Sequence, residues 1–483
     1  MTIINLRIAG TERASGTNRT FHRMNPVTGA VATEAAAASV DDARAAADAA
    51  AAAFPAWAAL GPNARRAILL KAADALAAKA DILTEAMATE IGATVGWARF
   101  NVGLASSMLR EAASLTTQVM GEVIPSDKPG CLSMSIREPA GVCLGIAPWN
   151  APVILGVRAL ATPLACGNAV VFKASEICPR THSLIVQALE EGGLPPGVVS
   201  LVTNAPEDAG DIVGALIDHP AIRRINFTGS TKVGRIIAER AGRNLKPCLL
   251  ELGGKAPLLV LKDADLDEAV KAAIFGAYFN QGQICMSTER IIVVEEVAEA
   301  FVQRFTERAQ GLKAGDPAKG EAPLGAVVDA HTVAKVQALV EDAQSKGARI
   351  TSAGRAEGVL LPAQVVDGVT SGMRIYAEES FGPVVAILRA KDEADAIRLA
   401  NDSEYGLSAA VFTRDISRGI AVARQIRSGI CHINGATVHD EAQMPFGGTG
   451  ASGYGRFGGQ SGIAEFTELR WVTIETQPGH FPI

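Results

Sequence analysis

With 483 residues, the chain is too long for a single hydrophobic core, so we expect two or three domains. Apolar residues make up 48% of the chain and charged residues 20%, a balance typical of globular proteins. The net charge of −6, without a basic stripe, argues against nucleic acid or an anionic membrane as a partner. No run of about 18 apolar residues predicts a membrane span, and residues 1–10 lack the pattern of a signal peptide.

The cysteines and histidines indicate where in the cell the protein works and whether it binds a metal. The seven cysteines form no CxxC pair, and in a chain of this length they are typical of reduced thiols in a cytosolic protein. We therefore expect a cytoplasmic location. The histidines are dispersed and no HExxH motif occurs, so we expect no metal site.

Helices and then a parallel sheet are predicted along the first half of the chain. Residues 39–60 are rich in alanine, and Ser39 or Asp41 can cap a helix there, while residues 64–88 continue as a second helical stretch. From about residue 142, short apolar runs alternate with helical patterns, which predicts a doubly wound α/β domain. The strands expected in this series are 142–147, 169–173, 198–202 and 222–227, and the helices are 151–166 and 181–191.

A second series of the same kind follows. It comprises a strand at 257–261, a helix from 266 to about 279 and a strand at 290–294, with further units through residue 406. Two α/β domains in succession are the simplest account. Two strand candidates, 132–136 and 471–474, have no obvious partner inside their own unit. We expect them to pair away from the core, at a subunit contact.

Cys285 is the candidate nucleophile. It ends a glycine- and glutamine-rich segment, NQGQIC, that follows a helical pattern. A thiol is a strong uncharged nucleophile, and loops often hold catalytic groups. The alternative is that Cys285 packs as a small hydrophobic residue, as most buried cysteines do. The polar flank favours the catalytic interpretation for Cys285 more than for the other six cysteines.

Glu251 and Asn150 are candidates for a general base and an oxyanion donor. Glu251 lies among leucines just before a Gly-Gly turn, and an apolar setting raises a carboxyl pKa toward neutrality. Its alternative role is a strand-end carboxylate paired to a lysine or arginine. Asn150 lies between a predicted strand and helix, where its amide can donate to developing negative charge. Its alternative role is a simple helix cap.

A candidate phosphate-binding turn lies at residues 225–234. The pattern is strand, glycine turn and helix, and free N–H groups at a helix start bind phosphate. Thr231 stands where the GxGxxG fingerprint has its middle glycine, so we expect the cofactor to lie differently than in an ordinary Rossmann domain. A true GxGxxG match occurs at 453–458. We interpret it as a chance match, because no strand precedes it and no helix pattern begins from it.

Taken together, these segments resemble the aldehyde dehydrogenase superfamily. The resemblance runs over nearly the whole chain, and its segments occur in the family's order. They are PWN (148–150), FKASE (172–176), FTGSTKVG (227–234), LELGGKAP (250–257), NQGQIC (280–285), EESFGPV (378–384) and PFGG (445–448).

The resemblance implies a role for each matching residue. Cys285 is the nucleophile, Glu251 activates the deacylating water, and the Asn150 side chain holds the oxyanion together with the Cys285 backbone N–H. Lys173 and Glu176 meet the adenosine ribose, and Glu379 and Phe381 the nicotinamide ribose. The full set of cofactor-binding residues that it implies is Ile146, Trp149, Lys173, Glu176, Gly229, Ser230, Thr231, Val233, Gly234, Leu252, Glu379 and Phe381.

The resemblance also implies a domain plan. A Rossmann-like NAD-binding domain comprises residues 1–121 and 142–252, and a catalytic domain comprises 253–455. A β-strand oligomerisation arm, at 122–141 and 464–483, contains the two leftover strands. Family members with such arms form homodimers or dimers of dimers, which is what we expect for this chain.

Glu176 favours NAD over NADP. A carboxylate accepts a hydrogen bond from a ribose 2′-hydroxyl and repels a 2′-phosphate. The alternative is that Glu176 swings aside and Lys173 holds the phosphate, which would allow both cofactors.

The substrate is predicted to be an aromatic aldehyde. Where common family members carry a bulky aromatic residue, this chain has Ala151, which leaves room for a ring. Arg158-Ala159 replaces a Trp-Lys pair that is frequent in the family, and Arg158 faces either a ring oxygen or a structural ion-pair partner. The pattern resembles the branch that oxidises salicylaldehyde, vanillin or benzaldehyde. The residues expected to line the substrate site are Trp97, Phe100, Ala151, Arg158, Phe275, Ile284 and Phe446.

Three alternatives stay open. The first is a broad-specificity, aliphatic or semialdehyde dehydrogenase, and the second a CoA-acylating relative, which Glu251 argues against because such relatives lack the base. The third is a non-enzymatic protein that has kept the fold, which the intact Cys285, Glu251 and Asn150 disfavour.

Overall fold

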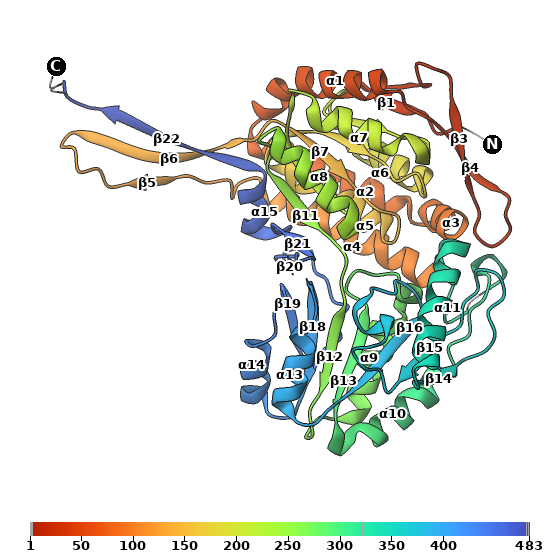
Figure 1. Ribbon diagram of the computed structural model, residues 1–483. Coiled ribbons are helices and arrows are strands. Elements are labelled where there is room, and N and C mark those ends of the chain that lie inside the picture. The colour runs from red at the N-terminus through yellow and green to blue at the C-terminus, as the bar shows by residue number, and fades with distance from the viewer. Residues whose placement is uncertain (1–2, 321, 480, 482) are drawn as a thin grey trace.

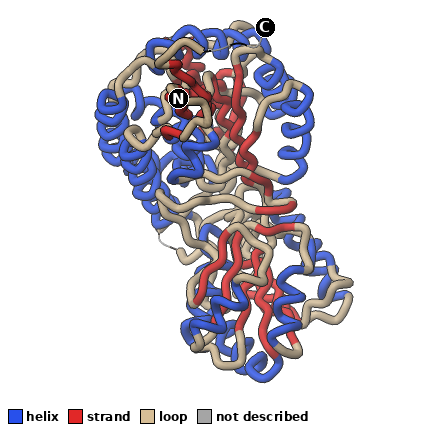
Figure 2. Tube along the Cα trace, turned by 90° about the vertical axis from the view of Figure 1, so that its left-hand side faces the viewer, coloured by secondary structure: helices blue, strands red, loops and turns tan. Residues whose placement is uncertain are grey.

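The chain folds into two α/β bodies and a β-arm, as Figure 1 shows. This computed structural model describes residues 3–320, 322–479, 481 and 483. Of the predicted domain ranges, residues 1–2, 321, 480 and 482 lie outside the described residues. Figure 2 shows the strands of each body enclosed between helices, which is the predicted α/β architecture.

The first body is built on an eight-stranded sheet with a parallel centre. Its central strands β9, β8, β7, β10 and β11 are parallel, and every residue of β7 and β8 is buried, as expected for strands covered on both faces. In spatial order the strands are β2 (Thr11–Arg13), β1 (Leu6–Ile8), β9 (Val199–Val202), β8 (Ala169–Lys173), β7 (Val142–Ile146), β10 (Ile222–Thr228), β11 (Cys248–Glu251) and β21 (Gly453–Tyr454).

Helices cover both faces of this sheet. Alternate residues of β8 enter different cores, with Val170 and Phe172 on one face and Ala169 and Val171 on the other. One face packs against α1 (Val40–Ala58), α7 (Ala209–Asp218) and α8 (Thr231–Arg243). The other face packs against α2 (Pro62–Ala78), α3 (Ala80–Ile91), α4 (Val95–Leu115), α5 (Pro152–Ala165) and α6 (Pro179–Glu191).

The helical stretch expected at 64–88 is confirmed, and the structure divides it into two helices, α2 and α3. Lys79 leaves helical geometry, with φ −88° and ψ 10°, and its N–H closes the last turn of α2 on the Leu76 carbonyl. No glycine or proline marks this break. Tertiary packing sets it, since α2 and α3 each contact both α4 and α6.

The second body is built on a seven-stranded sheet that is parallel except at one edge. Only β14 runs antiparallel, and apolar cores lie on both faces. In spatial order the strands are β14 (Arg349–Ser352), β15 (Gln364–Asp367), β16 (Val384–Ala390), β13 (Thr288–Val294), β12 (Ala256–Val260), β18 (Ser408–Phe412) and β19 (Ile430–Ile433). Its helices are α9 (Leu266–Tyr278), α10 (Glu295–Ala309), α11 (Ala330–Ser345), α12 (Arg374–Ala377), α13 (Glu393–Asn401) and α14 (Ile416–Ala423).

The two leftover strands pair with each other in a separate sheet. β22 (Thr467–Glu475) runs antiparallel to β6 (Cys131–Pro139) with Trp471 opposite Ser135, and β5 (Glu122–Ile124) pairs on the other edge of β6. This sheet extends away from the first body (Figure 1), and Trp471 is 76% exposed. The expectation that these strands pair away from the core is confirmed.

Short elements complete the fold. Two small antiparallel sheets pair β3 (Thr20–Met24) with β4 (Val31–Ala36) and β17 (Tyr405–Gly406) with β20 (Thr449–Gly450). The 3₁₀ helices are η1 (Pro206–Asp208), η2 (Phe279–Gly282) and η3 (Pro317–Lys319). In the described part of the chain, no helix is long and apolar enough to cross a membrane.

The surroundings expected for the GxGxxG match at 453–458 are wrong. Gly453 and Tyr454 form β21, and α15 (Gly459–Glu465) begins directly after the match. A Cβ on Gly453, whose φ is +96°, would lie 2.1 Å from the Leu250 carbonyl oxygen. The first glycine therefore serves close antiparallel pairing of β21 with β11, rather than a strand-to-helix phosphate turn.

Candidate active site

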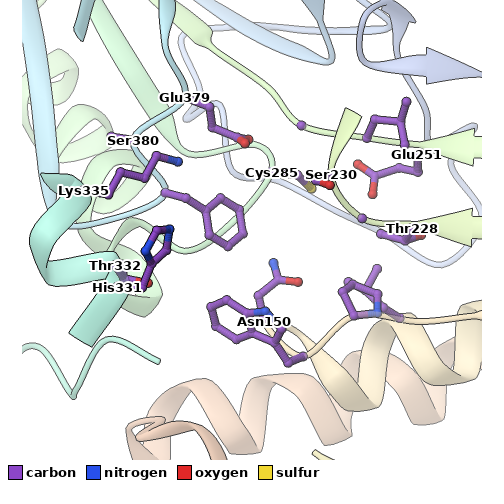
Figure 3. A pocket seen from close by; sticks show the side chains of 17 residues that line it. Asn150, Thr228, Ser230, Glu251, Cys285, His331, Thr332, Lys335, Glu379 and Ser380 are labelled. Carbon is purple, nitrogen blue, oxygen red and sulfur yellow. The ribbon is translucent and has the colours of Figure 1, made fainter. Parts of the chain in front are cut away.

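Asn150, Glu251 and Cys285 meet at one cavity of about 270 Å³. Asn150 follows β7, Glu251 is the last residue of β11, and Cys285 follows η2. Figure 3 shows these three side chains extending from different elements into the same space. The cavity lies beyond the carboxyl ends of β7, β10 and β11, which is where open α/β sheets bind ligands.

A strained turn places Cys285. Asn280 and Gln281 adopt left-handed backbone angles, with φ of +49° and +55°. The Gln281 side chain holds the turn by donating to the Ala326 carbonyl at 3.0 Å and accepting from the Gly325 N–H at 2.9 Å. The strain is balanced by these buried amide contacts, which explains the glutamine-rich flank of Cys285.

Asn150 is fixed next to this turn. Its Nδ2 donates to the Gln283 carbonyl at 2.9 Å, and its own carbonyl accepts from Trp97 Nε1 at 2.9 Å and from Asn280 Nδ2 at 3.0 Å. The Asn150 side chain does not cap α5, whose N-cap residue is Ala151. The alternative of a simple helix cap is therefore wrong. The amide carries a second N–H, which has no acceptor among the described residues.

Glu251 is buried without an ionic partner. It is 1% exposed, and neither carboxyl oxygen has a hydrogen-bond or ion-pair partner within the described residues. The alternative of a strand-end carboxylate paired to a lysine or arginine is therefore wrong. Burial raises the pKa of Glu251 to about 7. A carboxyl with this pKa exchanges a proton readily at neutral pH.

The Cys285 thiol is protonated at rest. Burial raises the pKa of the thiol well above its ordinary value, and the neighbouring Glu251 carboxyl raises it further. The positive charge of Arg158 acts in the opposite direction on both groups. All seven cysteines are free, but Cys285 is the one that lines this cavity among the residues described.

The predicted phosphate turn forms one wall of the cavity. Gly229 and Ser230 line it where β10 passes into α8, and the Ser230 side chain caps that helix by accepting from the Val233 N–H. A Cβ on Gly229 would lie 2.4 Å from the Phe227 ring, and one on Gly234 would lie 2.5 Å from the Leu252 side chain. These two glycines therefore allow close packing beneath an open helix N-terminus.

The predicted cofactor residues divide into two groups. Trp149, Gly229, Ser230, Leu252, Glu379 and Phe381 line the cavity. Ile146, Lys173, Glu176, Thr231, Val233 and Gly234 do not line it and lie at or just beyond the carboxyl ends of β7, β8 and β10.

Lys173 and Glu176 form an ion pair with an N–O distance of 2.8 Å. Burial opposes ionisation of Glu176, but the charge and hydrogen bond of Lys173 outweigh it, so the pKa of Glu176 lies below its ordinary value. Glu176 is therefore an anion at neutral pH.

Glu379 and Phe381 lie across the cavity from the predicted phosphate turn at residues 225–234. Glu379 accepts from the Gly254 N–H at 2.8 Å, and burial raises its pKa to about 7. Phe381 has a φ of +52° and packs edge-on against Trp149 with 5.8 Å between ring centroids. Both residues line the cavity, and Figure 3 shows Glu379 on the side away from Glu251.

The sequence analysis missed one side of the cavity. His331, Thr332 and Lys335 reach it from the first turns of α11, as Figure 3 shows. His331 and Lys335 are four residues apart and so share a helix face. That spacing is visible in the sequence, but nothing in the sequence shows that the start of α11 lines the same cavity as Glu251.

A second cavity of about 250 Å³ also reaches Cys285 and Asn150. All seven residues predicted to line the substrate site, from Trp97 to Phe446, line it. Trp97 and Phe100 stack with 5.6 Å between centroids, and Phe275 stacks on Phe279 at 4.8 Å. The additional lining residues that the sequence analysis did not select are Leu104, Ile154, Leu155, Met286, Val438, His439 and Asp440.

Arg158 has an ion-pair partner in this second cavity. Its Nη2 lies 2.5 Å from Asp440 Oδ2, and its guanidinium lies over the Phe446 ring, 4.1 Å from the centroid. The sequence left open whether Arg158 faces a ring oxygen or a structural partner. The structure shows the partner and also places Arg158 in the cavity wall.

Comparison with known proteins identifies the family. Residues 13–472 match the Aldehyde dehydrogenase family. The chain belongs to this family. It is therefore an oxidoreductase that acts on aldehydes and uses NAD(P), so the alternative of a non-enzymatic protein is wrong. The predicted family and fold class are confirmed.

Several relatives are similar to this aldehyde dehydrogenase over nearly their whole length. A vanillin dehydrogenase of Pseudomonas fluorescens is 59% identical over 99% of both chains, and a salicylaldehyde dehydrogenase of Pseudomonas putida is 52% identical over 97% of both. Among solved structures, a salicylaldehyde dehydrogenase from Pseudomonas putida G7 complexed with salicylaldehyde superposes with a TM-score of 0.98, at 50% identity and with full coverage of both chains. A betaine aldehyde dehydrogenase from Staphylococcus aureus in complex with NAD⁺ has a TM-score of 0.94 at 30% identity, covering 99% of this chain and 95% of that one.

Proposed function

We propose that this aldehyde dehydrogenase oxidises aromatic aldehydes to carboxylic acids, with NAD as the acceptor and Cys285 as the nucleophile. The observation that carries the proposal is the second cavity, whose aromatic walls lead to the Cys285 thiol. Flat rings on several sides suit a planar aromatic substrate. The names of the relatives, vanillin and salicylaldehyde dehydrogenase, support the same class of substrate.

The first cavity fits a nicotinamide dinucleotide. The N-terminus of α8 offers N–H groups to a pyrophosphate, with Gly229 and Ser230 at the cavity wall. The partly buried Glu379 carboxyl accepts a hydrogen bond from the Gly254 N–H and from no other donor among the described residues, so it has capacity left for a ribose hydroxyl. When bound, the cofactor accepts the hydride that leaves the substrate carbon.

Cys285 and Asn150 begin the reaction. Glu251 takes the thiol proton, and the sulfur attacks the aldehyde carbon, so the carbonyl becomes an oxyanion. The free Nδ2–H of Asn150 and the backbone N–H of Cys285 donate to that oxyanion. Losing one preorganised donor of this kind typically costs about 3–4 kcal/mol of barrier. The Gln283 carbonyl fixes the amide through its other N–H, so the donor needs no reorientation.

Glu251 also ends the reaction. After hydride loss, the acyl group is held as a thioester on Cys285. Glu251 first releases the thiol proton to solvent and is again a carboxylate. It then removes a proton from water, and the oxygen of that water attacks the thioester carbon. The C–S bond breaks, the acid leaves, and the sulfur regains a proton. The raised pKa of Glu251 suits this work because the group is partly ionised at neutral pH.

The preference for NAD rests on Glu176. An anionic Glu176 accepts from a ribose 2′-hydroxyl and repels a 2′-phosphate. Its ion pair with Lys173 occupies the cation that would otherwise bind such a phosphate. Comparing kcat/KM for NAD and NADP with one aldehyde tests this, and a clear preference for NADP would contradict it.

The domain roles, oligomeric state and location belong to the same proposal. Residues 1–121 and 142–252 bind the cofactor, 253–455 form the catalytic domain, and the arm at 122–141 and 464–483 makes subunit contacts. The exposed Trp471 and Leu469 on β22 suit such a contact, in a homodimer or a dimer of dimers. Seven free cysteines suit a cytoplasmic location.

A panel of aldehydes tests the proposed function. NADH production is measured with benzaldehyde, ring-substituted benzaldehydes, hexanal and octanal, each with and without coenzyme A. We expect kcat/KM to be highest for the aromatic aldehydes and independent of coenzyme A. A wide preference for the straight-chain aldehydes would overturn the aromatic assignment.

A further inference from the structure

A buried ion pair interrupts the apolar wall of the second cavity. Arg158 comes from α5 and Asp440 from the loop after β19, and their side chains are 6% and 7% exposed. Around them the wall is largely apolar, including Phe446, Val438 and Met286. The pair therefore places one positive and one negative charge in this otherwise largely apolar wall.

Stability alone does not explain this pair. Removing two charges from water costs several kcal/mol per ion. Replacing a buried ion pair by apolar residues of similar volume often leaves the folded protein equally stable or more stable. The Phe446 ring under the guanidinium recovers part of that cost. A buried pair in a cavity wall is therefore better explained by a ligand that it contacts.

The pair has unused hydrogen-bonding capacity. Within the described residues, only Nη2 of the Arg158 guanidinium donates a hydrogen bond, so Nε and Nη1 have no acceptor. Asp440 accepts on Oδ2 alone, and its Oδ1 has no partner there. Because Arg158 lines the cavity, its free N–H groups can donate to a polar atom of a bound ligand.

The guanidinium also lies close enough to the reactive groups to affect them. Its charge lowers the pKa of both Cys285 and Glu251, against the larger effect of burial. Arg158 and Cys285 line the same cavity, so a substrate whose aldehyde carbon lies at Cys285 extends its ring into a space that Arg158 helps to enclose.

We propose that the Arg158–Asp440 pair makes this enzyme selective for benzaldehydes that carry an oxygen substituent on the ring, with Arg158 donating a hydrogen bond to that oxygen. Asp440 is a positioning residue that holds the guanidinium against Phe446. This inference rests on the proposed function, since it names the subclass of aromatic aldehyde that the same site takes. A hydrogen bond to a charged group contributes selectivity of about tenfold or more.

The first test uses the unmodified enzyme. Hydroxy- and methylbenzaldehydes substituted at the 2, 3 or 4 position are compared, because a hydroxyl and a methyl group are similar in size. We expect kcat/KM for the hydroxyl compound to exceed that for the methyl compound by about tenfold at one position at least. A ratio within threefold of one at all three positions overturns the inference, whatever the variants do.

The second test removes the donor. R158M keeps much of the stem volume, and R158M/D440L also removes the carboxyl that would otherwise stay buried and uncompensated. Loss of the positive charge raises the pKa of the Cys285 thiol, which slows the oxidation of every aldehyde. The quantity compared is therefore kcat/KM for the hydroxybenzaldehyde divided by kcat/KM for the methylbenzaldehyde. We expect this ratio to fall about tenfold in both variants and only partly in R158K, since lysine keeps the charge without the planar fork.

A matched control is R304M, on the exposed face of α10, which should leave the ratio unchanged. A ratio that stays within threefold of the unmodified value in R158M/D440L overturns the inference. If benzaldehyde itself is not oxidised by the unmodified enzyme, the proposed function fails; if it is oxidised but the ratio does not depend on Arg158, only this inference fails.

Discussion

The two cavities that meet at Cys285 differ in the groups that line them. The first is polar: it contains the carboxyls of Glu251 and Glu379 and the cation of Lys335, with the N-terminus of α8 at its edge. The second is enclosed mainly by rings and aliphatic side chains, with charge concentrated in the Arg158–Asp440 pair. Under the proposed function, cofactor binding and deacylation belong to the first cavity and substrate choice to the second.

This division explains how one family serves many aldehydes. The polar cavity is formed at strand ends and by a strained turn, where small shifts misplace reacting groups. The apolar cavity is formed largely by side chains on α4, α5 and α9 and on the loop after β19, which lie outside the turn that carries Cys285. The account predicts that changes in the first cavity affect all aldehydes alike and that changes in the second alter preference.

Replacing Cys285 should have the largest effect. C285A removes the atom that bonds to the substrate, so we expect turnover of every aldehyde to fall about 10⁴-fold or more. Binding of NAD, measured by calorimetry, should persist because the cofactor contacts lie elsewhere in the first cavity. Substantial oxidation by C285A would contradict the role of the thiol.

Replacing Asn150 should have the next largest effect. N150A removes an N–H donor to the oxyanion, so kcat should fall about 10²- to 10³-fold for aromatic and aliphatic aldehydes alike. Because Asn150 also donates to the Gln283 carbonyl, thermal unfolding of N150A should be measured beside its kinetics. A loss confined to one class of aldehyde would break the proposed division between the cavities.

The pH dependence of deacylation tests the raised pKa of Glu251. Deacylation requires the carboxylate, so its rate should fall as the pH falls through about 7, by about tenfold for each unit below that value. The decay of the acyl-enzyme can be followed by mass spectrometry after quenching. A rate that stays constant down to pH 5 would contradict the assignment of Glu251 as the base.

Replacing Phe100 should have the smallest effect and the most selective one. F100A removes a ring that stacks on Trp97 in the second cavity, so kcat/KM for benzaldehyde should fall about three- to tenfold relative to hexanal. The reference is the ratio for the unmodified enzyme. An equal loss for both aldehydes would show that this ring does not select the substrate.

The sequence predicted the candidate catalytic residues, because each of them lies in a recognisable motif. Cys285, Glu251 and Asn150 each lie in a segment whose residue types point to its chemistry, and the resemblance then joined these segments, which are 34 to 135 positions apart (285 − 251 = 34; 285 − 150 = 135). The seven residues predicted for the substrate site were chosen for three reasons. Ala151 leaves room for a ring, Arg158 faces either a ring oxygen or an ion-pair partner, and the other five offer apolar walls. All of them line one cavity.

What the sequence could not predict depends on tertiary contacts. Asp440 and Arg158 are 282 positions apart in the chain, and no local sequence pattern near either residue predicts that they pair. His331 and Lys335 reach the first cavity because the fold of the second body brings the start of α11 to it. The break at Lys79 and the strand at Gly453 are likewise set by packing against distant elements.

The most direct measurement is a rapid-mixing experiment with E251Q, NAD and benzaldehyde. If Glu251 is needed to hydrolyse the Cys285 thioester, E251Q should form up to one equivalent of NADH per active site. NADH production should then almost stop, with an acyl group left on Cys285. The thiol must then lose its proton to solvent, so the burst should be faster at higher pH. Continuous turnover at the rate of the unmodified enzyme would contradict the account.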